Sequence, residues 1–170
     1  IVSVLMGMAL TLPISSAALG VILNLSGIAA GAATVGCCAQ MIGFATASFR
    51  ENGIGGLLAQ GIGTSMLQVP NIVRKPLIWL PTIITSAILG PISTVVLKMT
   101  NNAIGSGMGT AGLVGPIMAY KTMITNTSPT ITILMILVML IIAPAFLTYF
   151  ISEAMRRKGL IKDGDMKLEI

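Results

Sequence analysis

Histidine is absent from this chain of 170 residues, and aromatic residues make up only 4% of it. The two cysteines, Cys37 and Cys38, are adjacent within an apolar run, which favours a packing role over a disulfide. A Ser-His-Asp set, a metal-ligand cluster and a Walker-type phosphate loop are also missing. These absences predict no metal, no cofactor and no catalytic residue within the chain. An enzyme acting alone is therefore the least favoured class.

Charged residues are scarce as well, at 9% of the chain, whereas a soluble domain usually carries about a quarter. They are also segregated, because five long runs contain none: residues 1–49, 52–73, 76–97, 99–120 and 122–152. A helix needs roughly 20 apolar residues to cross the hydrocarbon of a bilayer. The sequence therefore predicts an all-α, multi-pass membrane protein. A soluble fold is disfavoured because too little polar surface remains to cover it.

Four segments are predicted to span the membrane, namely residues 2–23, 27–48, 77–97 and 130–151. Pro13 lies inside the first segment and should kink or break its helix, because proline removes one backbone donor. The fourth segment is the most apolar and has almost no glycine, so we expect it to face lipid.

Small residues are frequent in the second predicted span. Gly27 and Gly31 form a G-x-x-x-G pattern there, and Gly36 follows. Such spacing lets a neighbouring helix approach closely, because no side chain separates the two backbones. We therefore expect another helix to pack closely against this span.

Lysine and arginine set the predicted orientation, because basic residues concentrate on the cytoplasmic side. Residues 153–170 carry five of the ten basic residues and are predicted to be a basic, solvated cytoplasmic tail. They follow a transmembrane permease domain of residues 1–152. Four spans then place eight basic residues inside, against Lys98 and Lys121 outside. Trp79 is the only tryptophan, and we expect it to anchor the third span at the interface.

Two glycine-rich stretches interrupt the apolar pattern. Residues 61–70 read GIGTSMLQVP and residues 107–116 read GMGTAGLVGP, so both fit G-x-G-T-x-x-L-x-x-P. The segments that contain them, residues 51–75 and 98–129, are too rich in Gly, Asn, Thr and Pro for simple spans. Each should begin and end on the same side of the membrane. We therefore predict two re-entrant segments that enter from opposite faces and meet near the midplane, as broken helices do in secondary transporters.

These two segments supply the candidate binding groups. A G-x-G-T turn exposes backbone N–H groups, and nearby hydroxyls and amides donate and accept hydrogen bonds, which suits a neutral polyhydroxylated ligand. An anion fits less well because no lysine or arginine lies inside either glycine-rich loop, and a cation fits poorly because neither loop has a carboxylate beyond Glu51 at its edge. The alternative for the glycines is a purely structural role. The predicted substrate-binding residues are Gln60, Gly61, Gly63, Thr64, Ser65, Gln68, Asn71, Asn101, Asn102, Gly107, Gly109 and Thr110.

The stretches at residues 61–81, 86–99 and 105–116 resemble the EIIC-like membrane proteins of the bacterial phosphotransferase system. The branch concerned includes the perfringolysin-regulator-like (PfoR-like) proteins, and the resemblance covers about residues 50–150. It implies a homodimeric sugar permease subunit of the bacterial plasma membrane, working with cytosolic IIA- and IIB-type partners that phosphorylate the sugar. No nucleic-acid partner is expected. The chain begins at Ile1, so we expect the C-terminal part of a longer transporter.

One departure from that family stands out. Its well-studied permeases place a glutamate, and often a histidine, near the sugar and the phosphoryl donor. This chain has no histidine, and Glu51 is its one candidate acid near a loop. The leading hypothesis is a sugar permease. The alternatives are a membrane sensor with the same fold and no net transport, and an ion-conducting carrier or channel with carbonyl-lined loops.

Overall fold

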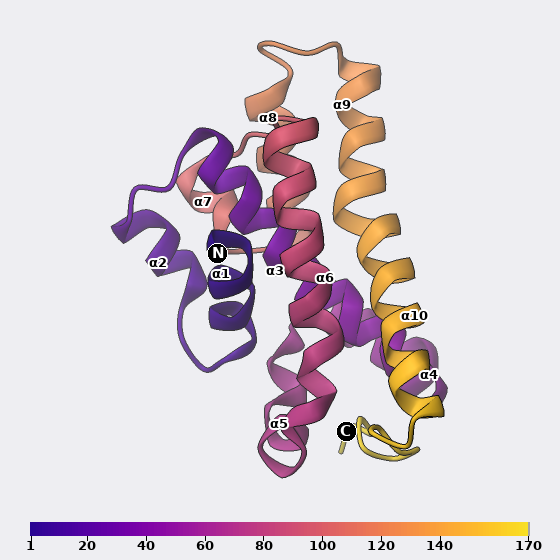
Figure 1. Ribbon diagram of the computed structural model, residues 1–170. Coiled ribbons are helices and arrows are strands. Elements are labelled where there is room, and N and C mark those ends of the chain that lie inside the picture. Colours follow the sequence, from indigo (N-terminus) through magenta and orange to yellow (C-terminus); the bar gives the residue numbers. More distant parts are fainter. Residues whose placement is uncertain (170) are drawn as a thin grey trace.

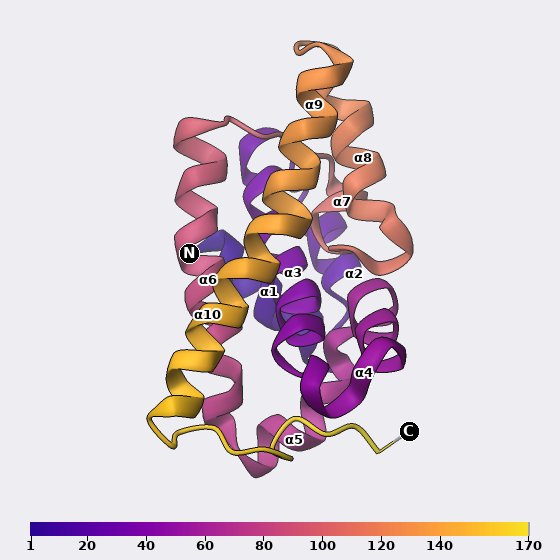
Figure 2. The same ribbon diagram turned by 90° about the vertical axis from the view of Figure 1, so that its right-hand side faces the viewer.

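A computed structural model describes residues 1–169 as an all-helical molecule. Three of its helical segments are long and apolar enough to cross a membrane. They are α3 (Gly27–Ala47), the continuous segment Pro76–Val96 and the continuous segment Pro129–Arg157. Figures 1 and 2 show these segments running along the length of the molecule. The predicted all-α membrane class is confirmed.

The second and third crossings are each assembled from shorter pieces. Pro76–Val96 comprises η3 (Pro76–Trp79), α6 (Leu80–Pro91) and the wide π-helical turn η4 (Ile92–Val96). Pro129–Arg157 comprises α9 (Pro129–Ile136), the wide turn η6 (Leu137–Ile142) and α10 (Ala143–Arg157).

The first predicted span, residues 2–23, is not one continuous crossing. It consists of α1 (Val2–Thr11) and α2 (Ser16–Ile22), which turn back on each other (Figure 1). The sequence predicts a kink or a break at Pro13, and the structure shows a break. Leu12 is extended, as expected for a residue before proline. With ten residues, α1 is about 15 Å long, too short to cross the hydrocarbon.

Close packing of α1 against α3 depends on two glycines. A Cβ on Gly36 would overlap the backbone of Ser3, and a Cβ on Gly7 would lie 2.6 Å from the Gly36 carbonyl oxygen. On α3 as well, a Cβ on Gly31 would overlap the main-chain carbonyl of Met99. The predicted close approach is thus present at Gly31 and Gly36. Gly27 instead begins α3 with a φ of +58°, and a Cβ there would meet no atom within 4 Å. The α3 helix is largely buried, and α1, α6 and α10 pack around it.

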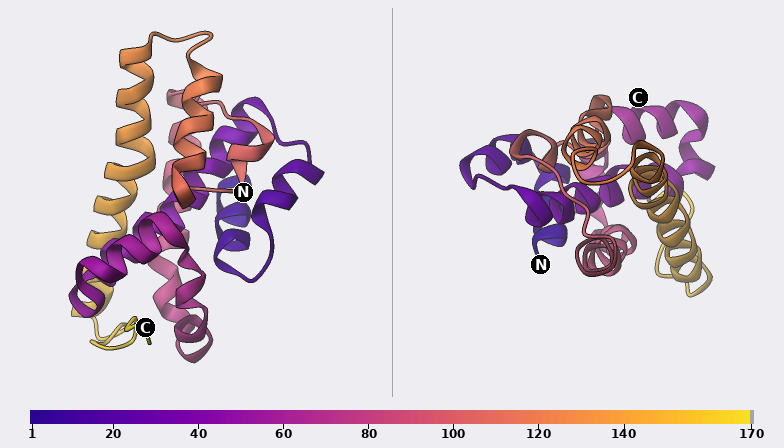
Figure 3. Two further views of the ribbon diagram at one scale, coloured as in Figure 1. Left: turned by 180° about the vertical axis from the view of Figure 1, so that it is seen from behind. Right: turned by 90° about the horizontal axis from the view of Figure 1, so that it is seen from above.

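Residues 49–74 form the first hairpin. It consists of α4 (Phe49–Leu58) continued by the wide turn η1 (Ala59–Gly63), and a return arm of η2 (Ser65–Gln68) and α5 (Val69–Arg74). Both ends of this hairpin lie at the end of the molecule where α10 finishes (Figures 1 and 3).

Residues 99–123 form the second hairpin. It contains α7 (Ala103–Ser106), the short turn η5 (Ala111–Leu113) and α8 (Val114–Met123). Figure 3 (left) shows that it enters from the end opposite to the first hairpin, and that the two approach each other in the middle of the molecule. The predicted arrangement of two opposed hairpins is therefore present in the fold. Their depth in a bilayer stays a prediction.

The residues after α10 differ from the predicted solvated tail. Residues 161–169, named the strap here, run back across the ends of α4 and α5 (Figure 2). The side chains of Ile161, Met166 and Leu168 are buried. Apolar residues spaced along a basic segment can thus attach it to the protein surface, while its lysines remain in water.

Candidate functional site

The tips of the two hairpins touch through one hydrogen bond. The Oγ1 hydroxyl of Thr110 donates to the main-chain carbonyl of Gly61, at 2.5 Å. Gly109, directly before Thr110, has a φ of +52°, and a Cβ there would lie 2.9 Å from the backbone of Cys37. Glycine is therefore required at position 109 by both its conformation and the nearby helix α3. Thr64, by contrast, is extended and separates the two arms of the first hairpin.

A cluster of polar side chains lies where the first tip meets the long helices, and we name it the central cluster. Its centre is Gln40 in α3, which is fully buried. The Gln40 Oε1 atom accepts hydrogen bonds from Trp79 Nε1 and Thr82 Oγ1, each at 2.8 Å, and from Thr11 Oγ1 at 3.3 Å. The hydroxyls of Thr11 and Ser65 lie 2.9 Å apart. Five elements, α1, α3, η2, η3 and α6, thus contribute polar groups to one cluster.

The orientation of the Gln40 amide follows from its neighbours. An indole N–H can only donate, so the atom that faces Trp79 must be the amide oxygen. The Gln40 Nε2 atom is left buried without a hydrogen-bond partner among the described residues. Sequence reasoning missed Gln40. The available signal was its position as the only amide within the predicted span 27–48, where a polar residue is costly. Trp79 is predicted from the sequence to anchor the third span at the membrane interface. Its half-buried indole also belongs to this cluster, through the hydrogen bond to Gln40.

Three predicted amides form a chain at the base of the first hairpin. Gln68 Nε2 donates to Gln60 Oε1, and Asn71 Nδ2 donates to Gln68 Oε1, each at 2.9 Å. Gln60 in turn donates to Ser48 Oγ at 2.8 Å. Gln60 and Gln68 are fully buried and Asn71 is nearly so. In this conformation these amides bind other protein groups, including the strap, and do not face an open polar cavity.

The predicted residues of the second hairpin are also engaged within the fold. Asn101 Nδ2 donates to Thr34 Oγ1 at 2.7 Å, which ties the hairpin to α3. Asn102 caps α7, since its Oδ1 accepts from the Gly105 amide at 2.9 Å. The Gly107 carbonyl accepts from Ser16 Oγ in α2 at 2.6 Å. These groups hold the second hairpin in place.

Two of the predicted loop residues are more accessible. A Cβ on Gly63 would meet no atom within 4 Å, and the residue is exposed. Thr64 is half-buried, and its Oγ1 accepts from the Met66 amide at 3.1 Å, which leaves its hydroxyl proton free to donate. The structure therefore brings Gly61, Gly63, Thr64, Ser65, Gly109 and Thr110 together at the tips. Gln60, Gln68, Asn71, Asn101, Asn102 and Gly107 lie behind them as supports.

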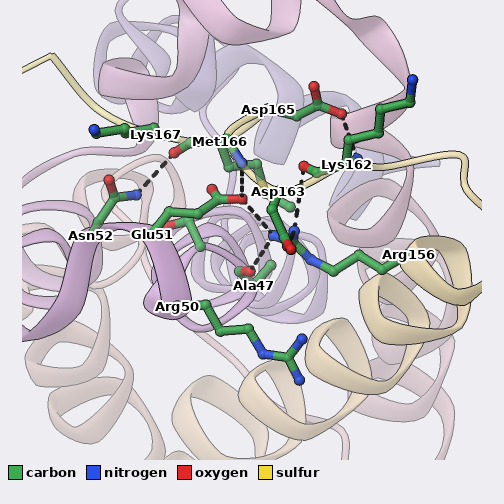
Figure 4. A network of polar contacts seen from close by, with 12 residues as sticks. Ala47, Arg50, Glu51, Asn52, Arg156, Lys162, Asp163, Asp165, Met166 and Lys167 are labelled. Carbon is green, nitrogen blue, oxygen red and sulfur yellow. Dashed lines mark hydrogen bonds and ion pairs between the residues drawn. The ribbon is translucent and has the colours of Figure 1, made fainter.

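The candidate acid Glu51 lies in the first turn of α4, at the base of the first hairpin, and Figure 4 shows it beside Arg156 and the strap. Its side chain is 6% exposed and pairs with Arg156, whose side chain is 7% exposed, at 3.0 Å. The same carboxylate oxygen accepts from the Gly164 amide at 3.0 Å. Glu51 is thus committed to holding α4, α10 and the strap together.

Asp165 of the strap forms a second ion pair, with Lys75 Nζ at 2.8 Å. Partial burial acts to raise the pKa of Asp165, but the hydrogen bonds from Lys75 and from the Lys162 amide outweigh it, so its pKa is lowered. A carboxylate with a lowered pKa stabilises the fold above its unfolded value of about 3.9, and that contribution is lost as the pH falls through the lowered value.

The difference in melting temperature between the wild type and Asp165→Asn tests this contribution. We expect it to be constant from about pH 7 to pH 5 and to shrink below about pH 4. A difference that grows on acidification would contradict the assignment.

A lateral groove elsewhere on the molecule is unsuited to a polar ligand. It has a volume of about 400 Å³ and is almost entirely apolar, and its lining residues are Thr46, Phe49, Leu57, Ala145, Phe146, Tyr149 and Phe150. The polar groups that could recognise a hydrophilic solute are gathered at the tips and in the central cluster instead.

Comparison with known proteins gives one match. The family model described as "Phosphotransferase system, EIIC" matches residues 1–168, almost the whole chain. No curated protein and no solved structure matches the chain.

Proposed function

Since the chain belongs to the EIIC family of the phosphotransferase system, we propose that it is a permease subunit that moves a sugar or a similar neutral polar metabolite across the membrane. The family has a permease-type role in the membrane, in association with other components of the phosphotransferase system. The substrate class is inferred from the polar groups at the hairpin tips.

The observation that supports this proposal most directly is the contact between the two tips. Broken helices that meet at the middle of a membrane protein form the substrate sites of many secondary transporters. Here the Thr110–Gly61 bond joins two hairpins that enter from opposite ends of the molecule. Separation of the tips would open a path from one side at a time. We assign the present structure, in which they touch, to a closed state.

The chemistry of the central cluster favours a neutral ligand. Its side chains are hydroxyls, an amide and an indole, and none of them carries a charge. A sugar hydroxyl both donates and accepts hydrogen bonds, so it can pair with hydroxyl, amide and indole N–H groups. An indole face also suits the apolar side of a sugar ring.

Phosphoryl transfer is assigned to cytosolic partner subunits. The chain has no histidine, and Glu51 is held in a buried ion pair. We therefore assign this subunit the tasks of binding and releasing the sugar.

The orientation in the membrane can be tested directly. The strap, α4 and α5 lie at one end of the molecule, and the connection between α8 and α9 lies at the other (Figure 1). We propose that the first end is cytoplasmic, because it carries most of the basic residues. Asn126 and Lys158 are exposed residues at these opposite ends, and each can be replaced singly as Asn126→Cys or Lys158→Cys. A membrane-impermeant maleimide applied to whole cells should label only Asn126→Cys. Labelling of both, or of Lys158→Cys alone, would contradict this topology.

Uptake of radiolabelled sugars into proteoliposomes tests the function. We expect Thr64→Val to lower uptake of the transported sugar by about fivefold while expression is retained, since one hydrogen bond is worth about 1 kcal/mol. Thr125→Val is the matched control, because Thr125 is exposed in the α8–α9 connection, far from the tips. Equal uptake by both variants would exclude a site at Thr64. Absence of uptake by the wild type, with ligand-dependent stabilisation retained, would instead support a sensor, and ion-selective currents would support a channel.

A further inference from the structure

The strap is held by its backbone, through side chains of the first hairpin. Asn52 in α4 donates from Nδ2 to the Met166 carbonyl at 2.9 Å and accepts from the Leu168 amide at Oδ1, at 2.8 Å. One amide side chain thereby makes the pair of hydrogen bonds that a neighbouring β-strand would make. Figure 4 shows Asn52 directed at Met166. Recognition of this kind depends on an extended peptide.

The return arm of the hairpin binds the same stretch. Gln68 Nε2 donates to the Met166 carbonyl at 3.0 Å, and Asn71 Nδ2 donates to the Lys167 carbonyl at 2.9 Å. The strap therefore bridges both arms of the first hairpin, from Asn52 on one side to Gln68 and Asn71 on the other.

Apolar side chains fix the strap in position. Ile161 and Met166 are 2% and 0% exposed and pack in one cluster with Phe44, Ile72 and Ile78. This cluster joins α3, α5 and the start of the third segment. Residues 162–164 between these anchors are exposed, and the strap is held there by polar contacts: the Gly164 amide donates to Glu51, and Asp163 and Asp165 pair with Arg156 and Lys75. Few buried contacts between the anchors make such a segment a natural unit of local opening.

The strap is connected to the tips by a short chain of hydrogen bonds. Gln68 donates both to Met166 and to Gln60, and Gln60 directly precedes Gly61. The carbonyl of Gly61 is the acceptor of the bond from Thr110. Loss of the strap would leave the buried Gln68 and Asn71 amides short of acceptors, and unpaired buried amides favour rearrangement of the arm that carries them.

We propose that the strap is a latch on the first hairpin: bound between its arms, it holds the tip against the second hairpin, and its release opens the space between the tips. The proposal rests on the function assigned above only in naming that space as the substrate path. The latch itself concerns the accessibility of the tip, which can be measured without any transport.

A buried reporter at the tip tests the latch. In a background with Cys37→Ala and Cys38→Ala, Ser65→Cys places one thiol at a fully buried tip position. We expect its labelling by a maleimide in detergent to become at least tenfold faster when Asn52→Ala is added, and faster again when residues 160–170 are deleted. Lys167→Ala is the matched control, because that side chain is exposed and only its carbonyl is bound. Its labelling rate should equal that of the parent.

A second reporter separates release of the latch from general unfolding. Ser86→Cys is equally buried, but lies in α6 against α3. It should stay protected in every strap variant. The proposal is overturned if Ser65→Cys remains protected after deletion of the strap, if Lys167→Ala accelerates labelling as much as Asn52→Ala, or if Ser86→Cys is exposed to the same extent. These labelling rates do not depend on sugar uptake. The experiment can therefore reject the latch proposal without rejecting the permease proposal, and the reverse.

Discussion

Replacement of Gly36 by leucine is expected to separate α1 from α3 and to lower the free energy of unfolding by about 3 kcal/mol or more. A Cβ at this position would already overlap the backbone of Ser3, and backbone atoms cannot move aside as a flexible side chain can. Insertion of atoms into a packed core costs typically about 1–3 kcal/mol, and a branched side chain at a backbone crossing belongs at the upper end of this range. Thermal unfolding in detergent, followed by circular dichroism, measures the effect.

Gly55→Ala is the matched control for that substitution. Gly55 also lies within a helix, yet a Cβ there would meet no atom within 4 Å. Alanine should therefore stabilise α4 by about 0.5–1 kcal/mol through helix propensity alone. If Gly36→Leu melts at the wild-type temperature, the close crossing of α1 and α3 does not exist.

Removal of the Arg156 charge is expected to have an effect of similar size. Glu51 and Arg156 are both more than nine-tenths buried, so Arg156→Ala leaves a carboxylate in the interior without its counter-charge. Breaking a buried pair in this way costs about 3–5 kcal/mol. The loss should appear as a lower melting temperature and as rapid proteolysis of the strap, which Arg156 also holds through Asp163.

Two further variants make the interpretation of that result specific. Arg157→Ala removes the same charge from the neighbouring exposed position and should change the melting temperature little. The double variant Glu51→Gln with Arg156→Met removes both charges and should recover part of the loss, because no buried charge is then unpaired. An Arg156→Ala protein as stable as Arg157→Ala would rule out the buried pair.

The membrane class and the two hairpins could be predicted from the sequence because they depend on local composition. Segregated charge identifies helices that cannot face water, and a stretch such as GIGTSMLQVP is a poor helix at any depth. The orientation of each hairpin then follows from which long helices flank it.

The partners of the polar side chains could not be predicted in the same way. The amides of Gln68 and Asn71 suit a ligand and a peptide carbonyl equally well, and only the path of the strap decides between them. That path depends on Met166 and Leu168, two buried apolar residues within a basic stretch whose composition predicts exposure to solvent. Gln40 was missed because its three donors come from distant parts of the chain. The hairpin of α1 and α2 was missed because a proline signals a break without giving the direction that follows it.

The hydrogen bond between the two tips has a consequence for which positions can vary in sequence. Thr110 binds a main-chain carbonyl, an atom that every amino acid possesses, and a Cβ at Gly61 would lie at an ordinary distance of 3.5 Å from Ala45. Substitutions on the exposed side of the tip, at Ile62 or Gly63, can therefore change the chemistry of the tip surface while the contact between the two hairpins is kept. The side chains of the tip are thus free to vary in a way that the main-chain contact beneath them is not.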